Sequence, residues 1–387
     1  MNIFLTGATG LVGGELLVEL SRRKDITKIY CLVRAADAVS GTERLKKIFA
    51  LRNDPFDPHK IIAIPGDLRD QSLTEKLISL KELQTVDVVI HSAANTSFSR
   101  IYNVMVEEIN IHGLYKILQW AKQLPNLSTF LYIGTATICG KNVTNTVIYE
   151  DQSPDINSSH VVRYTYTKMQ GELLLRNELP GEKILIARPS IIMGDSRPIT
   201  PRSPVILWAL ATINALRLCP FNEHAKLDII SADFAAAAII NLLFAKRRQY
   251  EVYHVSAGID AHTTAAQTLS TLEPFYTDLP AYKFIHKSAL KQIKFWSKGI
   301  QWEEASLLNE KQYLLHWEDQ FEDRKNLRVI LAGLEPYIEF IELEHVFDNS
   351  RLLADTGMTP PQPAHEYIVH SIPYLKSINI LEGAFDS

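Results

Sequence analysis

Short, continuous apolar runs recur along the first 255 residues, and segments with helical spacing of apolar residues separate them. The runs that we interpret as strands are residues 2–5, 29–33, 60–65, 86–91, 129–133, 183–188 and 250–255. Between them we expect helices that include residues 15–20, 104–124 and 166–178, and a capping box at Ser40 and Glu43 that begins the helix after the second strand. Strands that are apolar throughout indicate a parallel sheet covered by helices on both faces. The pattern therefore predicts an α/β fold with a doubly wound parallel sheet.

This regular alternation fails at two places. Residues 196–230 form an apolar, proline-flanked insert, and the chain after residue 258 is rich in tryptophan and glutamate. We therefore expect a sheet domain of residues 1–258, with an insert near residues 196–230, and a smaller, mostly helical C-terminal lobe of residues 259–387. Ligands of such sheets bind beyond the carboxyl ends of the strands, so both irregular parts belong on the substrate side.

Three glycines separate the first strand from the first helix. Gly7, Gly10 and Gly13 stand at every third position of the sequence TGATGLVG, as in the fingerprint of dinucleotide-binding units. The first glycine permits the tight turn, the second lets the backbone approach a pyrophosphate, and the third lets the helix pack closely. The N–H groups at the helix start would hold the anion. We predict a Rossmann dinucleotide-binding domain, and the alternative is an ordinary glycine-containing turn.

The composition narrows the class of protein further. The chain has 387 residues, 46% of them apolar, and a formal net charge of −4, which gives no reason to expect a nucleic-acid partner. Cys31, Cys139 and Cys219 are widely spaced, so we expect buried thiols in a reducing compartment. Met1 leads at once into the first strand, and no apolar run is long enough to span a bilayer. We expect a cytoplasmic protein without a transmembrane segment, and contact with a membrane surface stays open.

The residues that follow three of the strands suggest which dinucleotide binds. The second strand ends at Arg34, where an acidic residue would favour the ribose 2′-hydroxyl of NAD; a guanidinium suits the 2′-phosphate of NADP(H) instead. Arg44 would be a second phosphate ligand, and Asp67 would accept a hydrogen bond from the adenine amino group. Ala93 and Ala94 provide small side chains where the backbone passes close to the cofactor. Each residue also has an alternative without a cofactor: Arg34 would be a solvated arginine, Asp67 would cap a turn, and Ala93 and Ala94 would serve tight packing alone.

Candidate catalytic residues are Thr135, Tyr164, Lys168 and Asn110. Tyr164 and Lys168 stand at positions i and i+4 of a predicted helix and therefore address one site. We expect the ammonium of Lys168 and the nicotinamide cation to lower the pKa of the Tyr164 phenol, and Lys168 to hold the nicotinamide ribose. Thr135 follows the fifth strand and would hydrogen-bond a substrate carbonyl oxygen. The alternative is a strand-end threonine that only makes hydrogen bonds to backbone groups. Asn110 would bend its helix or hold a water that passes protons to Lys168.

These motifs together resemble the extended short-chain dehydrogenase/reductases. Besides the glycine turn, the resemblance rests on Gly66-Asp67-Leu68, on Asn110 with Gly113, and on Tyr164 with Lys168. The sequences LVR at residues 32–34, HSAANTSF at 91–98 and RPSIIMG at 188–194 are most similar to the thioester reductase and fatty acyl-CoA reductase branch. The likeness is good over residues 1–258 and thin over residues 259–387. One departure is Gly134, where that branch usually has a serine beside the threonine.

The resemblance implies an NADPH-dependent reduction of an acyl thioester to an aldehyde, and with a second hydride to an alcohol. Thr135 and Tyr164 would stabilise the oxyanion, and Tyr164 would protonate it. The apolar insert at residues 200–221 would suit an acyl chain. The alternative is that these residues only form the hydrophobic core of the smaller lobe. The cofactor-binding residues implied are Thr6, Gly7, Thr9, Gly10, Leu11, Val12, Gly13, Arg34, Arg44, Asp67, Leu68, Ala93, Ala94, Tyr164, Lys168, Pro189, Ser190 and Ile191.

Several questions stay open at the level of the sequence. A nucleotide-sugar epimerase or dehydratase shares the same core and the same Thr/Tyr/Lys set, and a hydroxysteroid-type dehydrogenase is another enzyme that this core would suit. The fold also serves as a non-catalytic NADPH sensor, but sensors typically lose the tyrosine or the lysine, and both are present here. No His or Cys spacing typical of metal sites occurs, so no metal is expected. The thioester would arrive on coenzyme A or on an acyl carrier protein, since no carrier domain is recognised in this sequence. Arg217, Lys226 and the basic run at residues 246–248 would suit an acidic carrier, or are simply solvated. The sequence does not indicate the oligomeric state.

Overall fold

The computed structural model describes residues 1–152, 154–199, 204–298, 311–321 and 323–386. Its centre is a seven-stranded parallel sheet with the strand order β12-β7-β5-β4-β1-β2-β3. The strands are β1 (Asn2–Thr6), β2 (Lys28–Val33), β3 (Ile61–Pro65), β4 (Val88–His91), β5 (Thr129–Ile133), β7 (Ile184–Pro189) and β12 (Val252–Val255). Each predicted strand is present to within a few residues, and the predicted Rossmann fold is confirmed.

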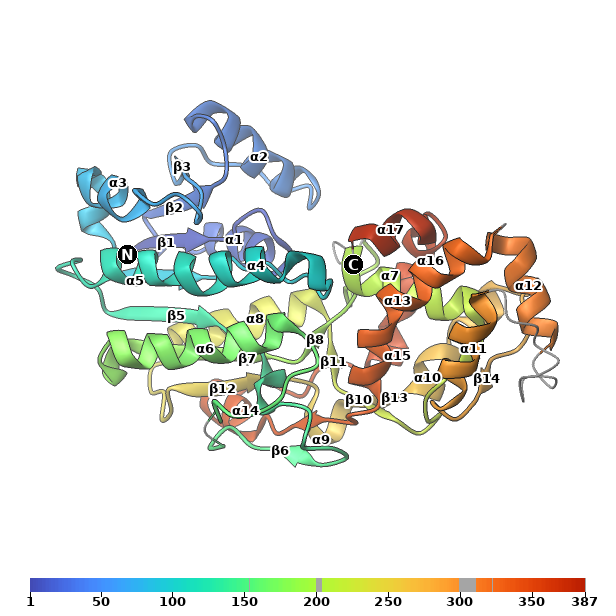
Figure 1. Ribbon diagram of the computed structural model, residues 1–387. Helices are drawn as coiled ribbons and strands as arrows, with labels where there is room; N and C mark the ends of the chain where they lie inside the picture. The colour runs from blue at the N-terminus through green and yellow to red at the C-terminus, as the bar shows by residue number, and fades with distance from the viewer. Residues whose placement is uncertain (153, 200–203, 299–310, 322, 387) are drawn as a thin grey trace.

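Helices cover both faces of this sheet (Figure 1). The helices packed against one face are α1 (Leu11–Ser21), α2 (Ala38–Ala50) and α8 (Ala232–Phe244). The helices packed against the other face are α3 (Leu73–Ser79), α5 (Leu114–Ala121) and α6 (Arg163–Glu178). In β1, Leu5 faces the first layer and Phe4 faces the second, and both are fully buried. Burial on both sides explains why the strands are apolar throughout.

The topology places a crevice between β1 and β4. From β1 the chain continues outward through β2 and β3, whereas β4 leads to β5 and β7 on the other side. Thr6 Oγ1 joins the two strand ends, since it lies 3.1 Å from Nδ1 of His91 and accepts a hydrogen bond of 3.1 Å from the N–H of Ala93. Dinucleotides bind in α/β sheets where the strand order reverses in this way.

A second, mostly helical lobe lies beyond the carboxyl ends of the strands, at the right of Figure 1. It has its own hydrophobic core, which joins segments far apart in the sequence. Its longer elements are α7 (Pro204–Leu216), α10 (Ala265–Ser270), α11 (Ala289–Ser297), α12 (Lys311–Phe321), α13 (Arg324–Ile341) and α17 (Ile380–Asp386). Parts of the predicted insert and of the predicted lobe, residues 200–203, 299–310, 322 and 387, lie outside the described residues.

The connections between the two parts are short paired segments. β8 (Ile191–Ile192) pairs with β11 (Ile229–Ile230), and β10 (Lys226–Leu227) pairs with β13 (Thr263–Thr264). Late in the chain, α14 (Ser350–Thr356) returns to the sheet domain and packs against α8 and β12. The chain therefore passes between the two parts several times.

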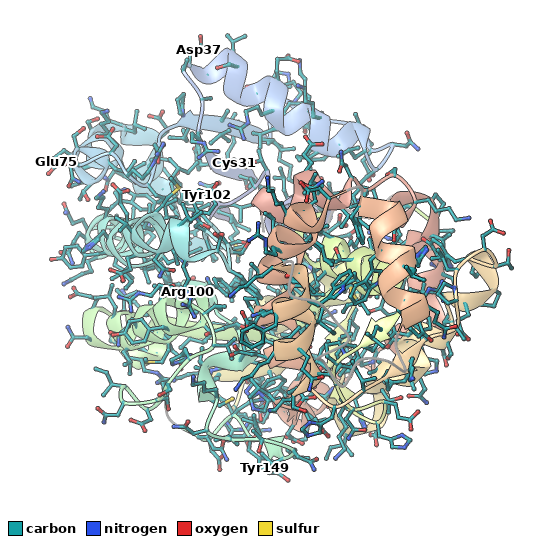
Figure 2. The ribbon with its side chains drawn as sticks, turned by 45° about the vertical axis from the view of Figure 1, so that its right-hand side comes forward. Cys31, Asp37, Glu75, Arg100, Tyr102 and Tyr149 are labelled. Atoms are coloured by element: carbon teal, nitrogen blue, oxygen red, sulfur yellow. The ribbon has the colours of Figure 1, made fainter. Side chains whose placement is uncertain are left out.

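The start of α2 differs from the prediction. Asp37, labelled in Figure 2, caps the helix, and its carboxylate accepts a 2.7 Å hydrogen bond from the N–H of Ser40. The Ser40 hydroxyl in turn accepts from the N–H of Asp37, so the capping box spans Asp37 and Ser40 rather than Ser40 and Glu43. Serine at the third helical position can replace the usual glutamate because the hydroxyl reaches the same N–H.

The thiols largely follow the prediction. Cys31, in β2, and Cys219, in β9 (Leu218–Cys219), are buried, whereas Cys139 is partly exposed; all three are free. Figure 2 labels Cys31 inside the sheet domain. Burial raises the pKa of both buried thiols, which keeps them protonated and unreactive.

None of the helices within the described residues is both long enough and apolar enough to cross a bilayer.

Candidate active site

The glycine turn after β1 leaves no room for side chains. Gly7 has a φ of +74°, and a Cβ on it would lie 2.7 Å from the backbone nitrogen of Ala93. A Cβ on Gly13 would lie 2.1 Å from the carbonyl oxygen of Gly7, and the N–H of Gly10 donates to that same oxygen at 2.9 Å. The turn, the start of α1 and the end of β4 are therefore in backbone contact, as the glycine spacing predicts.

The N-terminus of α1 faces this crevice without a side-chain cap. The N-cap residue is Gly10, whose backbone is extended and which has no side chain to make a capping hydrogen bond. Leu11, Val12 and Gly13 also line the cavity described below. Exposed N–H groups at a helix start favour an anion. The turn therefore fits the pyrophosphate of a dinucleotide.

A single cavity of about 740 Å³ runs along the carboxyl ends of the strands. It passes from the glycine turn, along the catalytic residues expected on α6 and after β5, into the second lobe. Every residue predicted from the sequence to bind the cofactor lines it: Thr6, Gly7, Thr9, Gly10, Leu11, Val12, Gly13, Arg34, Arg44, Asp67, Leu68, Ala93, Ala94, Tyr164, Lys168, Pro189, Ser190 and Ile191. Thr135 lines it too, whereas Asn110 does not.

Positive charge surrounds the end of the cavity beside β2. Arg34 is exposed, and a guanidinium N–H of Arg44 donates to its carbonyl oxygen, so the two arginines are held together. Arg69, which the sequence analysis missed, binds the carboxylate of Asp67 at 2.7 Å. This hydrogen bond, aided by the charge of Arg34, lowers the pKa of Asp67. Asp67 is thus an ionised acceptor beside two lining arginines.

The helix that carries Tyr164 and Lys168 begins earlier than its apolar pattern predicts. α6 starts at Arg163, so Tyr164 lies in its first turn and shares a face with Lys168. The ammonium of Lys168 donates a 2.6 Å hydrogen bond to the carbonyl oxygen of Ile133 and lies 4.8 Å from the centre of the Tyr132 ring. This hydrogen bond holds Lys168 against the end of β5, two residues before Thr135.

Burial decides the protonation of this pair. It raises the pKa of the Tyr164 phenol well above 10 and lowers the pKa of Lys168 from 10.5 to about 7. The direction expected for Tyr164 from the sequence was therefore wrong, because burial removes the solvent that would stabilise the phenolate. Tyr164 holds its proton at neutral pH, which makes it a proton donor rather than a phenolate.

Thr135 lies just after β5, with 7% of its surface exposed. Its hydroxyl is 2.9 Å from the hydroxyl of Thr137 and 3.4 Å from the carbonyl oxygen of Pro189. Both threonines line the cavity. The predicted oxyanion donor is therefore part of a pair of hydroxyls.

Asn110 has a bracing position behind the cavity. The predicted helix of residues 104–124 is interrupted, and Asn110 lies in a π-helical turn, η3 (Glu108–Gly113), between α4 (Asn103–Glu107) and α5. Its amide accepts from the N–H of Asn95 at 2.8 Å and donates to the carbonyl of Asn95 and to the hydroxyl of Thr167. The side chain thus connects the segment after β4 to α6, while the predicted water relay remains a prediction.

The sequence analysis missed the aromatic side chains near Tyr164. Phe98 has its ring centre 6.2 Å from that of Tyr164, 4.9 Å from Tyr337 and 5.3 Å from Phe340. Phe98 follows β4, whereas Tyr337 and Phe340 belong to α13 of the second lobe. The only sequence signal was the aromatic residue in the HSAANTSF motif, because local spacing cannot reveal a contact across more than 200 residues.

The part of the cavity inside the second lobe is apolar. α7 contributes five side chains, and the other members come from the segment between α7 and α8 and from α10 and α13. They are Val205, Ile206, Ala209, Leu210, Ile213, Phe221, Leu227, Ile229, Ala265, Leu269, Tyr337, Phe340 and Ile341. The described residues contain no cluster of three His, Cys, Asp or Glu side chains that could hold a metal ion.

A dinucleotide crevice with a Tyr-x-x-x-Lys helix beside it defines an oxidoreductase of the extended short-chain dehydrogenase/reductase class. The family model described as "Male sterility protein", an NAD-binding domain, matches residues 5–239. This is more than half of the chain, which therefore belongs to that family and carries a site for a nicotinamide cofactor.

Named relatives are similar at low sequence identity. Fatty acyl-CoA reductase 2 of Homo sapiens is 26% identical over 331 residues, which cover 72% of this chain and 63% of the relative. Fatty acyl-CoA reductase wat of Drosophila melanogaster is 28% identical over 243 residues, which cover 54% of this chain and 45% of the relative. The chain thus spans between about half and two thirds of the length of these two relatives.

Two solved structures share the fold. The terminal R domain from the myxalamid PKS-NRPS biosynthetic pathway has a TM-score of 0.70 and 22% identity, covering 98% of this chain and 92% of that chain. UDP-glucuronic acid 4-epimerase from Bacillus cereus has a TM-score of 0.63 and 17% identity, covering 97% of this chain and 99% of that chain. At this identity the likeness establishes the fold alone, because the R domain and the epimerase share one fold although they are different kinds of protein.

The packing at Gly13 generates a stability prediction. Replacing Gly13 with Ala forces the turn and α1 apart, because the new Cβ would overlap the carbonyl of Gly7. We expect a loss of roughly 1–3 kcal/mol in the free energy of unfolding, as for other overpacked sites, and weaker dinucleotide binding. Denaturant unfolding and fluorescence titration with NADPH measure the two effects.

Gly181→Ala is the matched control, since its Cβ would meet only the flexible side chain of Glu251. Equal stability of the Gly13 and Gly181 variants would contradict the packing argument.

The pKa of Lys168 predicts a pH dependence of stability. The unfolded chain keeps the Lys168 proton up to about pH 10.5, whereas the folded protein releases it near pH 7. Between these values folding releases a proton, so wild-type stability rises with pH. In the Lys168→Met variant this contribution is absent. We therefore expect the melting temperature of the wild type to rise relative to the variant between about pH 7 and about pH 9.

Lys246→Met, at an exposed position, is the control for changes in net charge. A difference between wild type and Lys168→Met that stays constant over this range would show that burial does not shift the pKa of Lys168.

Proposed function

We propose that this protein is an NADPH-dependent reductase of acyl thioesters, which converts them to aldehydes and, with a second hydride, to alcohols. The observation that carries the proposal is the continuity of the cavity. It joins the glycine turn, the Thr135, Tyr164 and Lys168 side chains, and the apolar compartment of the second lobe. An apolar compartment of this kind favours an aliphatic acyl chain.

The chemistry assigned to each residue follows from its environment. A bound reduced nicotinamide supplies the hydride for the carbonyl carbon. Thr135 hydrogen-bonds the carbonyl oxygen as negative charge develops, and Tyr164, whose raised pKa keeps it protonated, transfers its proton to that oxygen. Lys168 steadies the site from its position against the end of β5. The hemithioacetal then loses its thiol and leaves the aldehyde.

The choice of NADPH rests on Arg34 and Arg44. Both line the cavity, Arg34 is exposed, and the guanidinium of Arg44 donates to the backbone carbonyl of Arg34, so both residues lie at the end of β2. Guanidinium groups match the geometry and charge of a phosphate dianion. No acidic residue stands at the end of β2, where an NAD-dependent relative would use one to bind the ribose hydroxyls.

The relatives support the thioester as substrate. The human and fly proteins carry the name fatty acyl-CoA reductase, and one solved neighbour is a thiolation-reductase di-domain from an archaeal non-ribosomal peptide synthetase. Coenzyme A and a carrier protein present the acyl group on the same kind of thiol arm. Both forms of substrate are therefore included in the test.

The decisive assay follows NADPH consumption with purified protein. Acyl-CoAs, an acyl-carrier thioester, free aldehydes and a UDP-sugar are supplied separately, and products are identified. We expect thioester-dependent oxidation, and a loss of at least about a hundredfold in kcat for Tyr164→Phe, since that variant lacks the proton donor. Tyr115→Phe, on the surface of α5, is the matched control. Conversion of the UDP-sugar without net cofactor consumption would instead identify an epimerase.

The cofactor preference has its own test. Arg34→Asp removes a cation and places an anion beside the predicted 2′-phosphate. We expect the ratio of NADPH to NADH affinity to fall by roughly tenfold or more, because a charge-assisted contact is lost and repulsion is added. Arg247→Asp, an exposed position that does not line the cavity, should leave the ratio unchanged. An unchanged ratio for Arg34→Asp would contradict the assignment of NADPH.

A further inference from the structure

Two threonine hydroxyls meet at the reaction centre, and only one of them has been given a role. Thr135 follows β5, and Thr137 lies in the short helical turn after it, η4 (Ala136–Cys139). Their Oγ1 atoms are 2.9 Å apart, and both residues line the cavity. Residue 134, the neighbour of Thr135 on the other side, is glycine and contributes no hydroxyl. Thr137 is therefore the hydroxyl that directly contacts Thr135.

The direction of this hydrogen bond decides whether Thr135 can act. A hydroxyl has one proton, and it rotates to suit its partners. If Thr135 donated to Thr137, its proton would be engaged and could not reach a substrate oxygen. If Thr137 donates to Thr135, the proton of Thr135 stays available. The carbonyl of Pro189, at 3.4 Å, is also within reach of Thr135 as a weak acceptor, and a substrate oxygen at a normal hydrogen-bond distance would take the Thr135 proton in its place.

A second contact favours Thr137 as the donor. The N–H of Thr137 also points at Oγ1 of Thr135, at 3.4 Å, so Thr135 caps the turn as an acceptor. Two donors from one residue then converge on a single oxygen. A hydroxyl that accepts hydrogen bonds becomes a stronger donor, because chains of hydrogen bonds polarise one another.

We propose that Thr137 is a positioning residue for the reduction, one that orients and polarises the Thr135 hydroxyl so that its proton points at the substrate carbonyl oxygen. The inference rests on the proposed function, because it assigns Thr135 to the oxyanion. Thr137 acts through Thr135 and need not touch the substrate. It supplies, from the opposite side of Thr135, the second hydroxyl that Gly134 cannot.

The test replaces the hydroxyl and keeps the shape. Thr137→Val removes the donor, and we expect kcat with an acyl-CoA to fall roughly tenfold, with the KM for that substrate and the affinity for NADPH within about twofold of wild type. Thr137→Ser retains the hydroxyl, so it should restore most of kcat. Thr129→Val, at the opposite end of β5, is the matched control and should behave as wild type.

A double-mutant cycle separates positioning from a general structural effect. If Thr137 acts through Thr135, then Thr137→Val should lower kcat in the wild-type background and change it little in a Thr135→Val background. Additive losses, an unaffected kcat in Thr137→Val, or a Thr137→Ser variant as slow as the valine variant would each overturn the inference. Wild-type protein that consumes no NADPH with any thioester would reject the proposed function and this inference together, whereas an active wild type isolates the role of Thr137.

Discussion

Backbone contact at the carboxyl ends of β1 and β4 is the constraint on which the rest of the structure depends. Gly7 lies against Ala93, and Gly13 lies against the carbonyl of Gly7, so no side chain separates the turn, the helix and the neighbouring strand. The contact brings the uncapped start of α1 to the point where the strand order reverses. The cavity extends from this crevice to the arginines after β2 and to Tyr164 and Lys168 on α6.

Burial then gives the site its chemical character. The same exclusion of water that raises the pKa of Tyr164 lowers the pKa of Lys168, so the phenol keeps its proton while the amine approaches neutrality at physiological pH. Phe98 lies between Tyr164 and α13, with ring contacts to Tyr164 and to Tyr337. The second lobe therefore reaches the surroundings of Tyr164 as well as lining the apolar part of the cavity.

The second lobe itself is built from segments that are distant in the sequence. α7, α10 and α13 meet in one core, and all three line the apolar part of the cavity. In the sheet domain, the amide of Asn110 likewise connects two segments that are distant in the sequence, the one after β4 and α6. Contacts of this kind fix the positions of the segments around the cavity, and each contact joins residues that no local sequence pattern connects.

The sequence by itself determined the parallel sheet, the glycine turn and the pairing of Tyr164 with Lys168, because these follow from periodicity and spacing within about ten residues. Only the tertiary structure decided the pKa of Tyr164, the bracing contacts of Asn110, the pairing of Arg69 with Asp67 and the aromatic contacts of Phe98. The distinction has a physical reason. Local spacing fixes which face of an element a side chain occupies, whereas solvent exclusion and hydrogen-bond partners depend on which distant segments pack against that face.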